Sequence, residues 1–152
     1  MKLCSFFGHR DTQVDIQPIL RDIVINLIEK ENVTLFYVGL EGNFDSIALQ
    51  TLEELAKTYT QIKYYVVLAY MPKSKNKDLI FEKYNTIYPD GLEKTPLKYA
   101  LHRRNCWMVK KSDYVVTYVK RSFGGASQFK ELAEKQNKTV INIYDTLRTD
   151  IK

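Results

Sequence analysis

Three short glycine-containing segments have the residue types and positions that could bind an anion. Glycine lets the backbone approach a ligand closely, and the free N–H groups of a helix that begins there favour phosphate. Plain turn geometry is the alternative, since strand-to-helix turns use glycine as well. The ordinary dinucleotide and P-loop signatures do not occur in the sequence. The three segments are Gly8-His9-Arg10, Gly39-Leu40-Glu41-Gly42 and Gly124-Gly125-Ala126-Ser127.

Arg104 is the most informative single residue. It falls in the middle of an apolar stripe at helical spacing, where an arginine is costly unless it is paired or liganded. One interpretation is a guanidinium that holds a ligand phosphate or carboxylate. The other is a buried ion pair with a carboxylate such as Asp45 or Asp113. The stripe itself consists of Leu97, Ala100, Leu101 and Met108.

Two acidic residues and one histidine are further candidates. Asp45 can accept hydrogen bonds from a ribose or serve as a favourable charge in the first turn of a helix. Glu41 can act as a general acid or be solvated, and we favour the solvated state. His9 can bind a ligand or cap the next helix. The sequence assigns no catalytic residue, and with His102 on a polar helix face it indicates no zinc or Ser-His-Asp site.

The elements that must position these residues alternate between apolar strands and one-sided helices. This alternation predicts a single α/β domain over residues 1–152, a Rossmann-like three-layer sandwich. We expect a five-stranded, mostly parallel sheet with the strand order 3-2-1-4-5, and a ligand at the carboxyl ends of the strands. The glycine segments would then share one edge. The predicted strands cover residues 2–7, 33–38, 62–69, 114–119 and 139–143.

Residues 73–95 do not follow this alternation. They include a lysine-rich stretch at 73–77 and the turn signal Pro89-Asp90-Gly91. We predict an irregular surface excursion here, with a ligand lid as the alternative. After it, Pro96 can occupy the first turn of a helix that runs to about Lys111.

Composition limits the class of protein. The 152 residues are 45% hydrophobic and carry a formal net charge of +5, values typical of one globular domain that tolerates anionic partners. No apolar run approaches the ~18 residues of a membrane span. Cys4 and Cys106 have no metal-ligand spacing, which favours reduced thiols and a cytoplasmic protein. No cofactor is indicated, and a homo-oligomer is possible.

The ordered set of segments resembles the SLOG superfamily, which joins the DNA-processing protein A fold and the LOG phosphoribohydrolases. The resemblance covers nearly the whole chain and is greatest to the small YpsA-like bacterial and phage branch. Besides the three glycine segments, with Phe44 and Asp45 after the second, the markers include Ala69-Tyr70-Met71-Pro72 and Arg104-Asn105-Cys106-Trp107. Ser127 and Gln128 stand where the phosphoribohydrolases have Gly-Thr.

The resemblance implies a Rossmann-like sheet that binds a nucleotide or nucleotide-derived small molecule. The candidate ligand-binding residues are Gly8, His9, Arg10, Gly39, Glu41, Gly42, Phe44, Asp45, Pro72, Arg104, Asn105, Gly124, Gly125, Ala126 and Ser127.

Three functions fit this reasoning. The leading hypothesis is a module that senses or sequesters a nucleotide. The first alternative is an N-glycosidic hydrolase that acts on a nucleotide, with Glu41 or Asp45 as the acid. The second alternative is a DNA-binding protein, which we rank last because the basic residues are scattered along the sequence. Nucleic acid is therefore an unlikely partner in this interpretation.

Overall fold

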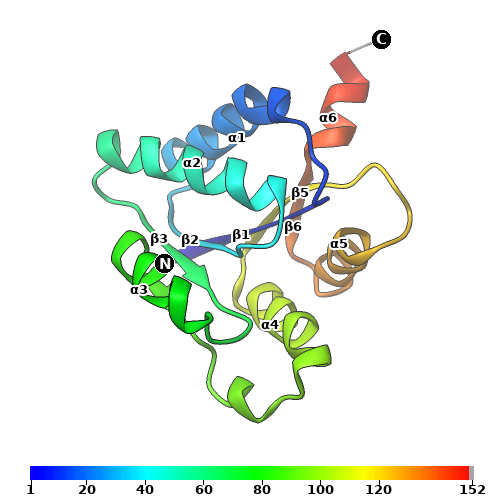
Figure 1. The fold of residues 1–152 in the computed structure, drawn as a ribbon. Helices are drawn as coiled ribbons and strands as arrows, with labels where there is room; N and C mark the ends of the chain where they lie inside the picture. Colours follow the sequence, from blue (N-terminus) through cyan, green and yellow to red (C-terminus); the bar gives the residue numbers. More distant parts are fainter. Residues whose placement is uncertain (151–152) are drawn as a thin grey trace.

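A parallel sheet organises the chain, and the computed structural model describes residues 1–150 (Figure 1). Within this range the sheet has six strands in the spatial order β4-β3-β2-β1-β5-β6, and every neighbouring pair is parallel. All strands therefore end at the same side, called here the carboxyl edge. The strands are β1 (Lys2–Gly8), β2 (Val33–Val38), β3 (Lys63–Val67), β4 (Thr86–Ile87), β5 (Tyr114–Tyr118) and β6 (Thr139–Asn142).

Helices cover both faces of this sheet (Figure 1). One face packs against α1 (Gln17–Glu29), α2 (Asn43–Thr58) and α6 (Ile143–Asp150), and the other against α4 (Leu97–Lys111) and α5 (Gly125–Lys135). Strand β1 shows why two layers are needed. Cys4 and Phe6 belong to the core on the α1 side, whereas Leu3 and Phe7 belong to the core on the α4 side. Alternate side chains of a strand point to opposite faces, so a continuously apolar strand must be covered twice.

The fold prediction is confirmed in outline and corrected in strand number. The five predicted strands correspond to β1, β2, β3, β5 and β6, and they lie in the predicted spatial order. The expected total of five is wrong, because the edge strand β4 also belongs to the sheet. It pairs with β3 through Val66↔Thr86 and Val67↔Ile87. Two residues are too few to produce a hydrophobic alternation, so the sequence pattern does not reveal this strand.

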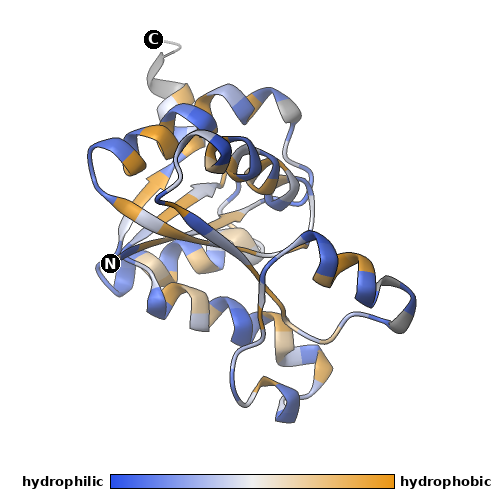
Figure 2. Ribbon diagram, turned by 90° about the vertical axis from the view of Figure 1, so that its left-hand side faces the viewer, coloured by the Kyte–Doolittle hydropathy of each residue, from blue (hydrophilic) through white to orange (hydrophobic). Residues whose placement is uncertain are grey.

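Residues 73–95 are also more regular than predicted. They contain α3 (Ser74–Lys83), β4 and a 3₁₀ turn at Leu92–Lys94. Figure 2 shows α3 projecting away from the two helical layers. Leu79 and Phe81 of this helix are exposed to solvent. The prediction of a surface excursion is therefore right, but the helix is missed because it lacks a clear buried stripe.

Candidate functional site

A cavity of about 470 Å³ opens at the carboxyl edge between β1, α4 and α5. It lies beside the central strand β1, where the chain direction across the sheet reverses, which is the expected place for a ligand in an open α/β sheet. Its volume lies within the ~300–1,000 Å³ typical of ligand pockets. The lining residues are Phe6, Phe7, Gly8, His9, Arg10, Asp11, Gly39, Glu41, Asp45, Leu101, His102, Arg104, Asn105, Met108, Arg121, Gly125, Ala126, Gln128 and Phe129.

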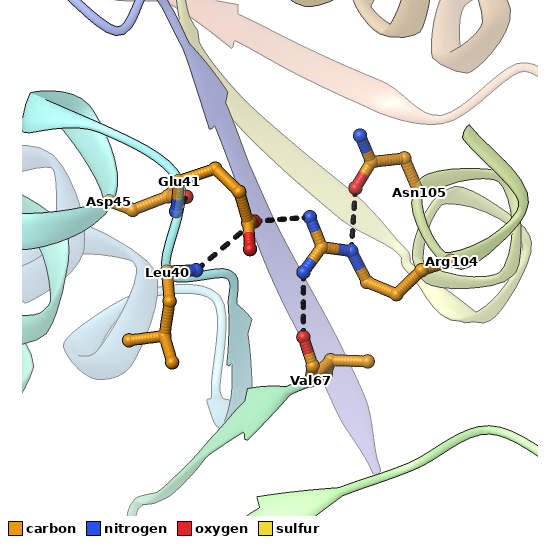
Figure 3. A network of polar contacts seen from close by, with 6 residues as sticks. All are labelled: Leu40, Glu41, Asp45, Val67, Arg104 and Asn105. Atoms are coloured by element: carbon orange, nitrogen blue, oxygen red, sulfur yellow. Dashed lines mark hydrogen bonds and ion pairs between the residues drawn. The ribbon is translucent and has the colours of Figure 1, made fainter. Parts of the chain in front are cut away.

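Arg104 is held in the wall of this cavity by three partners (Figure 3). Its Nε donates to Asn105 Oδ1 at 2.8 Å and its Nη1 donates to the carbonyl oxygen of Val67 at 2.7 Å. Its Nη2 donates to Glu41 Oε1 at 2.5 Å. The whole residue is only 3% exposed. The guanidinium thus ties α4 to the end of β3 and to the loop after β2.

The ion pair corrects two sequence expectations. The partner of Arg104 is Glu41, whereas Asp45 and Asp113 were the expected carboxylates. Glu41 is not the solvated charge that we expected, because its side chain is 18% exposed and is bound to the guanidinium. Gly39 explains the close approach. A Cβ atom at this position would lie 2.5 Å from Glu41 Oε1 and 2.9 Å from Arg104 Nη1.

Asp45 lies beside this pair in the cavity lining, in the first turn of α2. Its Oδ2 accepts a hydrogen bond from the backbone N–H of Glu41 at 2.8 Å. The pKa of Asp45 is raised to about 6, chiefly by burial and also by the charge of Glu41, against the lowering effects of the Glu41 backbone hydrogen bond and of the charges of Arg104 and Arg10. At neutral pH the carboxylate is mostly ionised, so it presents an acceptor to the cavity at a cost in stability.

His9 organises the loop that follows β5. Its Nε2 accepts hydrogen bonds from the backbone N–H of Lys120 at 3.0 Å and of Arg121 at 3.4 Å. Burial, followed by the charge of Arg121, lowers the pKa of His9, which keeps the imidazole neutral and able to accept. The structure thus gives His9 a positioning role within the protein, in place of the helix cap that was one of the two expected roles.

The rim of the cavity carries two further arginines. Arg121 forms a two-bond ion pair with Asp11, with both N···O distances at 3.2 Å. Arg10 lines the cavity and is exposed. Its Cα lies so close to Gly42 that an added Cβ there would approach it to 2.7 Å, and Gly42 also has a φ of 121°. Glycine is therefore required at this position.

The structure brings most of the predicted site residues to one cavity. The ten that line it are Gly8, His9, Arg10, Gly39, Glu41, Asp45, Arg104, Asn105, Gly125 and Ala126. The remaining five do not line it. Phe44 is buried against Gly8, Ser127 is buried in α5, and Gly42 and Gly124 shape the turns before α2 and α5. Pro72 lies in the loop after β3. Whether any of these residues binds a ligand stays a prediction.

Sequence reasoning did not select several cavity residues. Arg121 and Asp11 follow β5 and β1 at the carboxyl edge, so their positions were a usable signal. No such signal marks Phe7, Met108 and Phe129. Apolar residues that line a cavity have the same spacing in the sequence as apolar residues of the core. Phe7 and Phe129 stack with ring centroids 5.6 Å apart.

The described part of the chain contains neither a metal-binding cluster nor a membrane-spanning helix. Among residues 1–150, no group of three or more His, Cys, Asp or Glu side chains is arranged to hold a metal ion. Within the same range, no helix has the length and apolar character needed to cross a membrane.

Comparison with known proteins identifies relatives of the fold. No family model and no curated protein matches the chain. Among solved structures, the chain is similar to DNA processing protein A from Streptococcus pneumoniae, with a TM-score of 0.67 and 18% identity over 92% of this chain and 49% of that chain. It is also similar to DNA processing protein A from Helicobacter pylori, with a TM-score of 0.65 and 16% identity over 98% of this chain and 72% of that chain.

These neighbours establish a Rossmann-like fold of the kind found in DNA processing protein A. The Helicobacter structure is described for its single-stranded DNA binding mode. The chain spans about half the length of the Streptococcus protein. At these identities the similarity shows the fold, and it leaves the YpsA-like branch a prediction.

The comparison overturns our leading functional interpretation. A sensor or sequestering module for a small nucleotide, with nucleic acid an unlikely partner, is wrong in view of neighbours that process or bind DNA. The error came from judging basic residues by their spacing along the sequence. In a parallel sheet the segments after different strands meet at one edge, so Arg10, Lys73 and Lys120 lie at the same edge although they are far apart in the chain.

Proposed function

We propose that the protein binds single-stranded DNA along the carboxyl edge of its sheet. The observation that carries this proposal is a set of exposed aromatic and apolar side chains at that edge, next to basic ones. Tyr70 and Met71 follow β3, Phe123 follows β5, and Leu97 and Tyr99 lie in the first turn of α4.

These side chains suit unpaired bases. Tyr70 is 47% exposed and Phe123 is 69% exposed, so the rings of both are accessible to a partner. Proteins that bind single strands stack bases on such rings, which is worth ~1–3 kcal/mol per base. Bases in a duplex are already stacked and cannot use these rings. The edge therefore favours a single strand over a duplex.

Basic groups at the same edge can contact the phosphates. Arg10 follows β1, Lys73 precedes α3, and Lys120 and Arg121 follow β5. The first turn of α5, which begins at Gly125 directly after Gly124, adds backbone N–H groups, and a Cβ atom built on either glycine meets nothing within 4 Å. A strand can thus approach the backbone closely here.

The fold supports the same proposal, since one of its solved neighbours is described as binding single-stranded DNA. Two finer assignments rest on the sequence alone. We infer membership of the YpsA-like branch from the ordered markers. We infer a cytoplasmic location from the thiol cysteines, which are free in the structure.

Alanine variants of the edge aromatics test this proposal. Phe123→Ala and Tyr70→Ala should each weaken binding to a labelled oligothymidylate by about 5- to 100-fold, because each loses one stacking partner. Affinity is measured by fluorescence anisotropy, and thermal melting confirms that each variant is folded.

Tyr59→Ala is the matched control. Tyr59 follows α2 and precedes β3, so it lies at the opposite edge of the sheet, and its loss should leave the affinity unchanged. Full affinity in both Phe123→Ala and Tyr70→Ala would show that DNA does not bind at this edge.

A further inference from the structure

The cavity at the carboxyl edge has two chemically different walls. One wall is apolar and includes Phe7, Leu101, Met108 and Phe129. The other is polar and includes Glu41, Asp45 and Asn105 beside the buried Arg104. An apolar wall suits the flat faces of an aromatic ring, and a polar wall suits its hydrogen-bonding edge. A single base turned out of a DNA strand has this combination of surfaces.

The hydrogen bonds within the polar wall determine which of its donors and acceptors remain free to bind a ligand. Asn105 Oδ1 is occupied by Arg104 Nε, which leaves the amide nitrogen as the donor of this side chain (Figure 3). Glu41 uses Oε1 for Arg104 and for the backbone N–H of Leu40. Asp45 uses Oδ2 for the backbone N–H of Glu41.

The second carboxylate oxygen of each acid remains available. Among the described residues, no hydrogen bond reaches Glu41 Oε2 or Asp45 Oδ1. Every fully buried side-chain oxygen among the described residues has a hydrogen-bond partner, so these two unpartnered oxygens are not fully buried. The polar wall therefore combines one amide donor with carboxylate acceptors, while the positive charge of Arg104 is already neutralised by Glu41.

We propose that this cavity accepts one unstacked base of the bound strand and selects guanine. Guanine carries one acceptor, O6, beside two donors, N1–H and the N2 amino group. Asn105 Nδ2 would donate to O6, and the carboxylate oxygens of Asp45 and Glu41 would accept from N1–H and N2–H. This inference rests on the proposed binding of single-stranded DNA.

The other bases fit this pattern less well. Thymine has two carbonyl acceptors around a single N–H, so one carbonyl would face a carboxylate. Adenine and cytosine each carry one amino donor, and their ring nitrogen would likewise meet an acceptor. Carboxylate pairing of guanine also requires ionised acids. The pKa of about 6 at Asp45 leaves it mostly ionised near neutral pH.

Oligonucleotides that differ at one position test the selection. Three labelled oligothymidylates carry dT, dG or deoxyinosine at the central position, and inosine lacks only the N2 amino group. We expect the dG strand to bind about tenfold more tightly than the all-dT strand, in line with the discrimination of a good two-bond base contact. The inosine strand should fall between them.

Asp45→Asn should remove this preference, because an amide that keeps the Glu41 N–H bond turns its NH₂ group, a donor, towards the N1–H of guanine. The control is Asp22→Asn, which alters an exposed carboxylate of α1 outside the cavity and leaves the polar wall intact. Equal affinities for the dG and dT strands in a protein that binds both tightly would overturn guanine selection alone. Weak binding to every strand would overturn the proposed function and this inference with it.

Discussion

Arg104→Ala should lower the free energy of unfolding by about 3–5 kcal/mol, the loss typical of breaking a buried ion pair from one side. The substitution leaves the carboxylate of Glu41 without its cation and the carbonyl oxygen of Val67 without its donor. Both groups sit in the cavity wall or at the end of β3, where water replaces the lost contacts poorly. Urea denaturation monitored by circular dichroism measures the change.

The adjacent Arg103 provides the matched control. Its side chain is exposed and donates a 3.4 Å hydrogen bond from Nη1 to Thr95 Oγ1. Arg103→Ala should therefore change the free energy of unfolding by no more than ~0.5 kcal/mol. Equal losses in the two variants would mean that the network of Arg104 does not stabilise the fold.

Asp45→Asn should raise the free energy of unfolding at pH 7.5 by about 3 kcal/mol. The pKa of Asp45 rises from 3.8 to about 6 on folding, so the folded state resists ionisation of this carboxyl. A shift of roughly two pKa units costs about 3 kcal/mol once the group is ionised in both states. An amide has the shape of the acid without its charge and avoids this cost.

The stability gained by Asp45→Asn should increase as the pH rises. Because the folded pKa is raised, the favourable contribution of the protonated acid is complete below pH 3.8 and is lost as the pH rises to about 6. Asp45→Asn should therefore have little effect near pH 3.5 and its full effect above pH 6. Asp11→Asn is the control, since the Arg121 hydrogen bond lowers the pKa of Asp11 and no gain is expected. A gain for Asp45→Asn that is the same at every pH would contradict this explanation.

If removing the charge of Asp45 stabilises the protein, this result would support a role of Asp45 in ligand binding. Proteins keep costly charged groups mainly where a ligand uses them. Asp45→Asn is thus expected to separate two properties, with higher stability and lost base preference in the same variant.

The sequence predicted the architecture because the apolar runs of its strands extend over several residues. Strands β1, β2 and β5 are continuously apolar, which predicts a doubly covered parallel sheet whatever their partners are. The sequence did not predict strand β4, because two residues are too few to show a hydrophobic periodicity. It did not predict α3, because the apolar residues of this helix do not form a buried stripe.

The sequence predicted where the site lies, but it did not predict which carboxylate forms the ion pair with Arg104. The helical period correctly turned Arg104 inward, and the parallel sheet brought Gly8, Gly39 and Gly125 to one cavity. The choice of Glu41 over Asp45 as the ion-pair partner depends on the loop after β2, where Gly39 leaves room for both side chains. Side-chain distances on the ångström scale decide which carboxylate pairs with Arg104, and residue spacing in the sequence contains no information on such distances.

The affinity of the protein for single-stranded and duplex forms of one labelled oligonucleotide tests the central claim most directly. With strands of about 16 nucleotides and fluorescence anisotropy, we expect the single strand to bind at least about tenfold more tightly than its duplex, since only unpaired bases can stack on Tyr70 and Phe123. The logarithm of the affinity should fall with the logarithm of salt concentration with a slope near −2, as expected for about three phosphate contacts to a single strand. Equal or tighter binding of the duplex, or no binding of the single strand at low salt, would contradict the account.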